Sequence, residues 1–86
     1  RALILAAVIS VTLASPASAG PEVPFAERTA LLSLDRKCGL FDPGLRGALA
    51  AATAQARGAL LRSGWSEAQT DDLGRRAAAE GAGHAC

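Results

Sequence analysis

Cys38 and Cys86 are the only two cysteines in this sequence of 86 residues. In an exported protein, a single pair of cysteines is typical of one structural disulfide. A bond that closes so long a loop would remove chain entropy worth about 4 kcal/mol from the unfolded state. The alternatives are a bond between two chains and a chain cut short just after Cys86. The sequence favours a Cys38–Cys86 disulfide within one chain.

The single histidine, His84, is the other residue that could do chemistry. With the two cysteines it could bind zinc, but a zinc site needs three or four preset ligands, and His84 lies in a glycine-rich tail. With a serine and an acid it could form a hydrolytic triad, yet no serine stands in a nucleophile elbow. The residues concerned are Ser33, Ser63, Ser66, Asp71 and Asp72, which are more simply cap or surface residues. We therefore predict no catalytic residue, cofactor or metal, and we do not expect an enzyme.

Arg46, Arg57 and Trp65 are the candidate partner-binding residues. The two arginines lie nearly on one line of an expected helix, three turns apart, and Trp65 is the only tryptophan. Ion pairs with the acids of the following helix are the structural interpretation of the arginines. A surface for an acidic protein is the functional one. Trp65 stands just before a helix start, where an apolar residue can pack over the first turn.

The charge balance excludes two classes of partner. Arg1 accounts for the net charge of +1, so residues 20–86 are neutral. A nucleic-acid binder needs a basic excess to neutralise phosphates, and an anionic membrane surface binds polybasic segments. We expect neither nucleic acid nor a stable membrane association.

The first 19 residues predict where the protein goes. Ala2–Ala14 is an apolar run, too short to span a bilayer comfortably, and Ala17-Ser18-Ala19 places small residues at a cleavage site. The chain opens on Arg1, so we expect the basic leader of this signal to be truncated. An uncleaved anchor is the alternative. We predict a secretory signal peptide at 1–19 and a mature protein at 20–86 in the periplasm or outside the cell. Lipid attachment would need a cysteine as the first mature residue, and this residue is Gly20. We therefore expect the mature protein to be soluble.

The mature segment is expected to be all-α. Beyond Val23 the β-branched residues are reduced to three threonines, and alanine, the best helix former, dominates. Start signals are Asp42-Pro43 and the capping-box spacing of Ser66 and Gln69. Residues 20–24 are expected to be extended because they are rich in proline. With glycines 39, 64 and 81 as stops, the predicted helices cover about residues 24–37, 43–63 and 67–80.

Short connections make neighbouring helices antiparallel, which predicts a three-helix bundle whose third helix runs back toward Cys38. Arg36 and Lys37 are expected to suit the C-terminal end of their own helix. The expected inward residues of the first two helices follow 3–4 spacing, and the third helix has a thin stripe. In the first helix they are Glu27, Ala30, Leu31, Leu34 and Cys38. In the second they are Leu45, Leu49, Ala52, Ala56 and Leu60, and in the third Leu73 and Ala77. Because Leu32 and Leu61 lie off these stripes, a weak homodimer is also expected.

Two stretches, LDRKCGLFDP (34–43) and QARGALLRSGW (55–65), resemble short exported helical proteins of high-GC bacteria. The resemblance covers most of the mature chain, but it carries no functional residues, so nothing transfers from it. We expect a non-catalytic module that binds another protein or supports an envelope assembly. The alternative is a small secreted effector or an inhibitor of an extracellular enzyme.

Overall fold

A computed structural model describes residues 20–86, which form three α-helices and no strand. The helices are α1 (Glu22–Cys38), α2 (Pro43–Arg62) and α3 (Glu67–Ala82). The prediction of a three-helix bundle with one disulfide is therefore confirmed for this part of the chain. The leader predicted at 1–19 lies outside the described residues.

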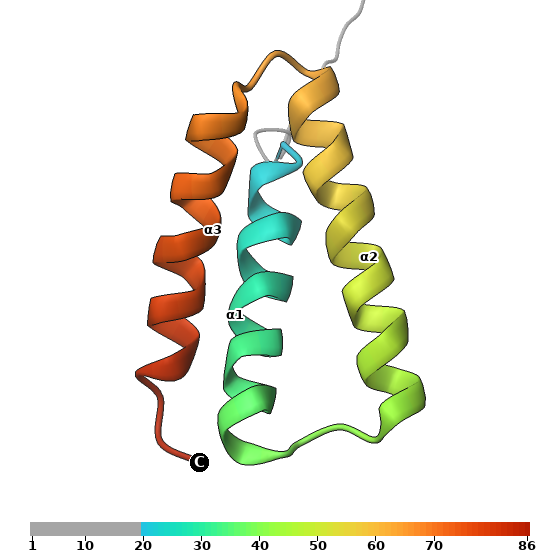
Figure 1. Cartoon of the computed structure of the whole chain (residues 1–86), viewed down its shortest axis with the longest axis vertical. Helices are drawn as coiled ribbons and strands as arrows, with labels where there is room; N and C mark the ends of the chain where they lie inside the picture. The colour runs from blue at the N-terminus through green and yellow to red at the C-terminus, as the bar shows by residue number, and fades with distance from the viewer. Residues whose placement is uncertain (1–19) are drawn as a thin grey trace, which may run out of the picture.

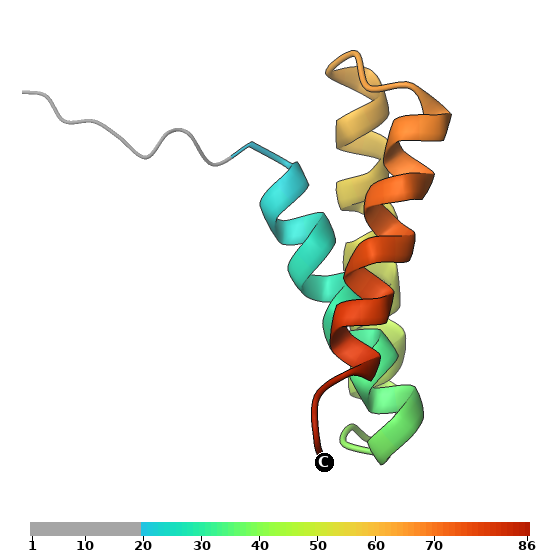
Figure 2. The ribbon, with the colours of Figure 1, turned by 90° about the vertical axis from the view of Figure 1, so that its left-hand side faces the viewer.

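The three helices form an open arrangement in which α1 lies between the other two (Figure 1). α1 packs most extensively on α3 and less on α2, whereas α2 and α3 hardly contact each other. α2 and α3 converge at their connection and separate toward their other ends, where the C-terminal half of α1 lies (Figure 1). In Figure 2 the first turns of α1 diverge from α3, so α1 crosses α3 at an angle. Both α2 and α3 thus pack mainly against α1.

The starts of α2 and α3 agree with their sequence signals. The Asp42 side chain accepts a hydrogen bond from the Leu45 N–H at 2.8 Å, and Pro43 occupies the first helical position. At α3 the Ser66 hydroxyl accepts from the Gln69 N–H at 3.0 Å. The Gln69 side chain in turn accepts from the Ser66 N–H at 2.9 Å. Both caps satisfy N–H groups that the first turn leaves without helical partners.

The start of α1 differs from the prediction. Residues 20–24 are not extended, because the helix begins at Glu22 and Pro21 is its N-cap residue. Pro24 falls in the first turn, where a backbone N–H has no helical acceptor, so the ring costs no hydrogen bond. The Phe25 N–H already donates to the Pro21 carbonyl at 3.2 Å. The prediction based on proline content therefore placed the start of this helix too late in the chain.

Gly39 ends α1 in the left-handed conformation, with φ at 64°, as the sequence indicated. Gly81, in contrast, does not end α3; it is buried in the last turn and faces α1. A methyl group on Gly81 would collide with the Ala30 carbonyl and lie 2.9 Å from the Ala30 Cα. Glycine at this position allows the backbones of α1 and α3 to approach closely.

The apolar core is small and lies near the connection between α2 and α3. Phe25, Ala56 and Leu60 are buried together, and Trp65 and Leu73 pack against them. The Phe25 ring lies over Gly74, where a methyl group would be 3.4 Å from the ring carbon Cζ. A phenyl group from α1 thus fills the space between α2 and α3 that their own side chains leave open.

The expected inward stripes are wrong at three positions. Leu31 is 43% exposed and Leu45 is 52% exposed, and Glu27 is exposed as well. The buried polar residues of the bundle are Ser33, Asp35 and Thr70. Since α1 has neighbours on two sides and α2 and α3 do not close around it, its apolar stripe is only partly covered.

Candidate functional site

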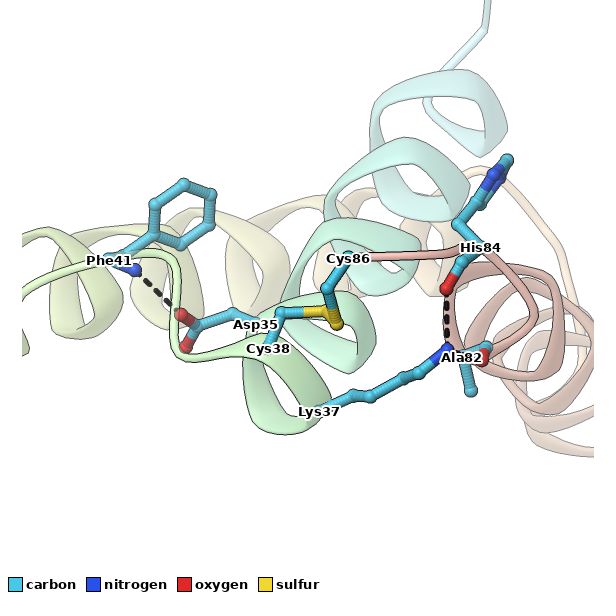
Figure 3. Close-up of a disulfide and its surroundings, with 7 residues drawn as sticks. All are labelled: Asp35, Lys37, Cys38, Phe41, Ala82, His84 and Cys86. Carbon is cyan, nitrogen blue, oxygen red and sulfur yellow. Dashed lines mark hydrogen bonds between the residues drawn. A yellow bond between two sulfur atoms is a disulfide. The ribbon is translucent and has the colours of Figure 1, made fainter.

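A buried carboxylate organises the turn between α1 and α2. The Asp35 side chain is fully buried and accepts a hydrogen bond from the Phe41 N–H at 2.7 Å (Figure 3). The same carboxylate accepts from Nε of Arg46, and from its Nη2 at 3.4 Å. Arg46 Nη2 also donates to the Phe41 carbonyl at 2.6 Å. Asp35, Phe41 and Arg46 therefore form one network, called the Asp35 network below.

Each charge of the Asp35 network stabilises the other. The hydrogen bond from Arg46, followed by that from the Phe41 N–H, lowers the pKa of Asp35 below its ordinary value of 3.8. The hydrogen bond to Asp35 and the Coulomb attraction of its carboxylate raise the pKa of Arg46 above its ordinary value. A buried carboxylate needs such partners because burial alone disfavours its charge. The network is thus a fixed ion pair at neutral pH.

Both candidate partner-binding arginines are engaged within the chain. Arg46 pairs with Asp35 of α1, although its expected ion-pair partners were the acids of α3. Arg57 of α2 does pair with α3, through Asp71 at 2.8 Å. The second pair is half exposed and contributes little to stability, about 0–1 kcal/mol. Each of the two arginines therefore has an ion-pair partner within the chain, Asp35 for Arg46 and Asp71 for Arg57.

Trp65 packs against the apolar core beside Leu60 and is only partly exposed. The backbone N–H of Trp65 donates to the Leu60 carbonyl at 3.1 Å, which holds the turn after α2. This position before the Ser66 cap is the one expected for a residue that packs over a helix start.

The disulfide joins the last residue of α1, Cys38, to Cys86 in the tail after α3. Cys38 and Cys86 are bonded, with their Cα atoms 5.6 Å apart. Next to the bond, Lys37 Nζ donates to the carbonyls of Ala82 at 3.0 Å and His84 at 2.5 Å (Figure 3). Lys37 stands in the last turn of α1 as expected, and its hydrogen bonds also stabilise the C-terminal end of α3.

The three residues considered as zinc ligands, Cys38, His84 and Cys86, do not form a metal site. Figure 3 shows the His84 ring directed away from the sulfur atoms, which are bonded to each other. Across residues 20–86, no group of three or more histidines, cysteines and acids could hold a metal ion.

The serines and acids of the imagined triad are also apart, and each serine hydroxyl has a backbone partner. Ser33 donates to the Ala78 carbonyl at 2.7 Å and Ser63 to the Leu60 carbonyl at 2.8 Å, while Ser66 caps α3. Asp71 and Asp72 lie in the first half of α3, whereas His84 follows its end. Twelve or more helical positions separate them, on the order of 18 Å. The three residue types therefore do not converge.

Three exposed leucines lie close in sequence to members of the Asp35 network, and the sequence had assigned two of them to the core. Leu31 lies one helical turn before Asp35, and Leu45 directly precedes Arg46. Leu40 directly precedes Phe41 and is 47% exposed. The leucine corner is defined here as Leu31, Leu40 and Leu45. It comes from both helices and from the turn between them, so the Asp35 network holds its three parts together.

Comparison of the chain with protein-family models, curated proteins and solved structures finds no match. On the surface formed by residues 20–86 there is no pocket. Among α1, α2 and α3, none is long and apolar enough to cross a membrane. We take the leucine corner, with leucines that are 43%, 47% and 52% exposed, as the candidate functional site on the described surface.

Proposed function

We propose that this protein is exported and that residues 20–86, an antiparallel three-helix bundle, act as a non-catalytic module that binds protein or supports an envelope assembly. The observation that carries the proposal is the leucine corner. Three leucines are 43%, 47% and 52% exposed around one turn. Exposed large apolar side chains in a small protein favour a contact surface, because leaving them in water forgoes the free energy of burial.

The support of the leucine corner suits it for binding. The Asp35 network ties α1, the turn and α2 through a buried ion pair and a backbone hydrogen bond at 2.7 Å. A surface that is already rigid loses little conformational entropy when a partner docks. The proposal of a binding module therefore rests on exposed apolar area together with a fixed backbone.

Export is supported by the disulfide and by the leader of the sequence. A Cys38–Cys86 bond persists in an oxidising compartment such as the periplasm or the extracellular space. This is the localisation that the apolar run and cleavage site at 1–19 predict. Cleavage would leave a soluble chain without a stable membrane association.

The test is cross-linking of residues 20–86 in the envelope fraction of a producing cell, followed by identification of the joined peptides. Leu31→Ser and Leu45→Ser should each abolish a specific cross-link. Val23→Ser is the matched control, because Val23 is 41% exposed on the same helix as Leu31 but lies in its first turn. If the leucine variants retain every cross-link of the wild type, the leucine corner is not the binding site.

A small inhibitor of an extracellular enzyme is the second candidate, and one observation favours it. Leu40 projects from a turn that two hydrogen bonds to its neighbour Phe41 hold in place. Inhibitors commonly present a rigid loop with one apolar anchor. In that case Leu40→Ser alone should abolish binding, whereas Leu31→Ser should leave it nearly unchanged. A broad protein-binding surface predicts that both substitutions weaken it.

A further inference from the structure

We infer that removal of the leader creates an ion pair within the mature protein, in which the α-ammonium group of Gly20 binds the side-chain carboxylate of Glu22. The inference rests on the proposed function in taking the chain to be exported and cut after Ala19. It adds what the new N-terminus does: the positive charge that processing creates is held at the start of α1.

The carboxylate of Glu22 is folded back over Gly20. A methyl group on the Gly20 Cα would collide with Oε1 of Glu22, and it would lie 3.3 Å from the carboxyl carbon Cδ and 3.4 Å from Oε2. The Gly20 carbonyl accepts a hydrogen bond from the Val23 N–H at 3.3 Å. Gly20 is therefore held at the first turn of α1, with one hydrogen of its Cα directed at a carboxylate.

Cleavage supplies a positive charge at this place. Hydrolysis of the Ala19–Gly20 peptide bond consumes one water and leaves a carboxylate on Ala19 and an amine on Gly20. An α-amine is mostly protonated at neutral pH. In the uncut chain the same nitrogen belongs to an uncharged peptide group. The ion pair can therefore form only in the processed protein.

The free amine reaches the carboxylate by rotation about one bond. The nitrogen and the two hydrogens on the Gly20 Cα occupy staggered positions, which exchange when the Cα–C bond turns by about 120°. Such a turn leaves the carbonyl and its hydrogen bond from Val23 in place. It puts the nitrogen where the added methyl group would have been, in contact with Glu22. Glycine permits the turn because it has no side chain to collide with the carboxylate.

Glu22 is the group that can hold the new charge. The helix dipole is positive at the N-terminal end of α1 and disfavours an ammonium group there, whereas a carboxylate in contact favours it. This end of the bundle is where Phe25 packs with Leu60 and Trp65. The other charged residues toward this end are Glu27 and Arg28 in α1, Arg62 at the end of α2 and Glu67 at the start of α3. These four carry no net charge together, so the effect of Glu22 is separable from theirs.

The experiment follows the titration of the Gly20 amine by NMR, in isotope-labelled protein purified from the exported fraction with its disulfide intact. Mass spectrometry of the same sample establishes which residue comes first. The Gly20 amine should bind its proton about two- to fivefold more tightly in the wild type than in Glu22→Gln. Glu27→Gln is the matched control, because it removes the same charge from an exposed position further along α1, and it should leave the titration nearly unchanged.

The wild type alone gives a second measurement, which does not depend on how well a variant folds. The chemical shift of the Glu22 carboxyl carbon should change with the same midpoint as the Gly20 amine, whereas that of Glu27 should not. Equal amine titrations in the wild type and Glu22→Gln, or an equal decrease in Glu27→Gln, overturn the inference and leave export and cleavage standing. Exported material that begins at another residue, or that retains the leader, refutes the proposed cut and the ion pair with it.

Discussion

The carboxylate of Asp35 and the guanidinium of Arg46 form an ion pair in which the acid is fully buried and the base is 42% exposed. The arginine also donates to the Phe41 carbonyl, while the acid accepts from the Phe41 N–H. One pair of side chains thus satisfies both backbone groups of a turn residue. Because such groups are costly to bury without partners, the pair fixes the path of the chain from α1 to α2.

Acid should destabilise the protein through this pair. The pKa of Asp35 is lower in the folded chain than its ordinary value of 3.8, so folding favours the charged form. Its contribution to the free energy of unfolding is complete above that ordinary value. The contribution is lost as the pH falls through the lower, folded-state pKa. We expect the melting temperature of the wild type to drop between neutral pH and about pH 2.

Asp35→Asn should have a lower melting temperature than the wild type at neutral pH, because Arg46 loses its charged acceptor. The variant should also show a weaker dependence on pH in the acid range, since the shifted group is gone. Asp71→Asn is the control, because its pair with Arg57 is exposed and should matter little. An identical acid transition in wild type and Asp35→Asn would show that other carboxylates cause it.

Signals within a few residues of each other in the sequence predicted where α2 and α3 begin, but they did not predict which residues pack together. The caps at Asp42 and Ser66 depend on residues three positions apart, so the sequence contains all of their information. The burial of Asp35 depends on a base eleven positions away and on a backbone group of the turn. Hydrophobic spacing places a carboxylate outside, and only the assembled turn shows why it lies inside.

The leucine corner is a second case in which the sequence could not predict burial, here for apolar residues that turn out to be exposed. Leu31 and Leu45 follow 3–4 spacing, which the sequence assigns to the core of a closed bundle. In the structure α2 and α3 separate where α1 enters between them, so both leucines remain exposed. The spacing identified apolar faces correctly, and it could not say whether the same chain covers them.

Gly81→Ala should destabilise the protein, although alanine is the better helix former. The added methyl group would collide with the Ala30 carbonyl, and backbone atoms cannot rotate away, so α1 and α3 must shift. We expect a cost of about 1–3 kcal/mol in the free energy of unfolding. Gly47→Ala is the control, because nothing lies within 4 Å of a methyl group there. That variant should gain up to about 1 kcal/mol. Chemical denaturation of both compares them, and an increase for Gly81→Ala would contradict the close contact.

Processing should remove residues 1–19. Mass spectrometry of exported material should place the N-terminus at Gly20 or within a residue or two of it, because Ala17-Ser18-Ala19 supplies the small residues of a cleavage site. Ala19→Leu should slow the cleavage and leave precursor, whereas Val23→Leu, beyond the site, should not. Recovery of the intact leader from membranes of wild-type cells would instead support an anchor.

Reduction of the Cys38–Cys86 bond should lower the melting temperature and loosen the end of α3 first. The bond closes a loop with a sequence separation of 48 residues, and its loss should cost about 4 kcal/mol. That is a large share of the stability a small domain has. Within α3 the last turn depends most on the bond, because Lys37 reaches the carbonyls of Ala82 and His84 only while the tail is held beside α1.

Amide hydrogen exchange, with and without reductant, measures where the protein loosens. Exchange should rise most at the end of α3 and least at the start of α2, whose cap at Asp42 is independent of the bond. Cys38→Ser should reproduce the reduced protein, and Ser63→Ala, which removes a local hydrogen bond only, should not. Two free thiols in the native exported protein, or a melting curve that reduction leaves in place, would refute this assignment of the bond's role.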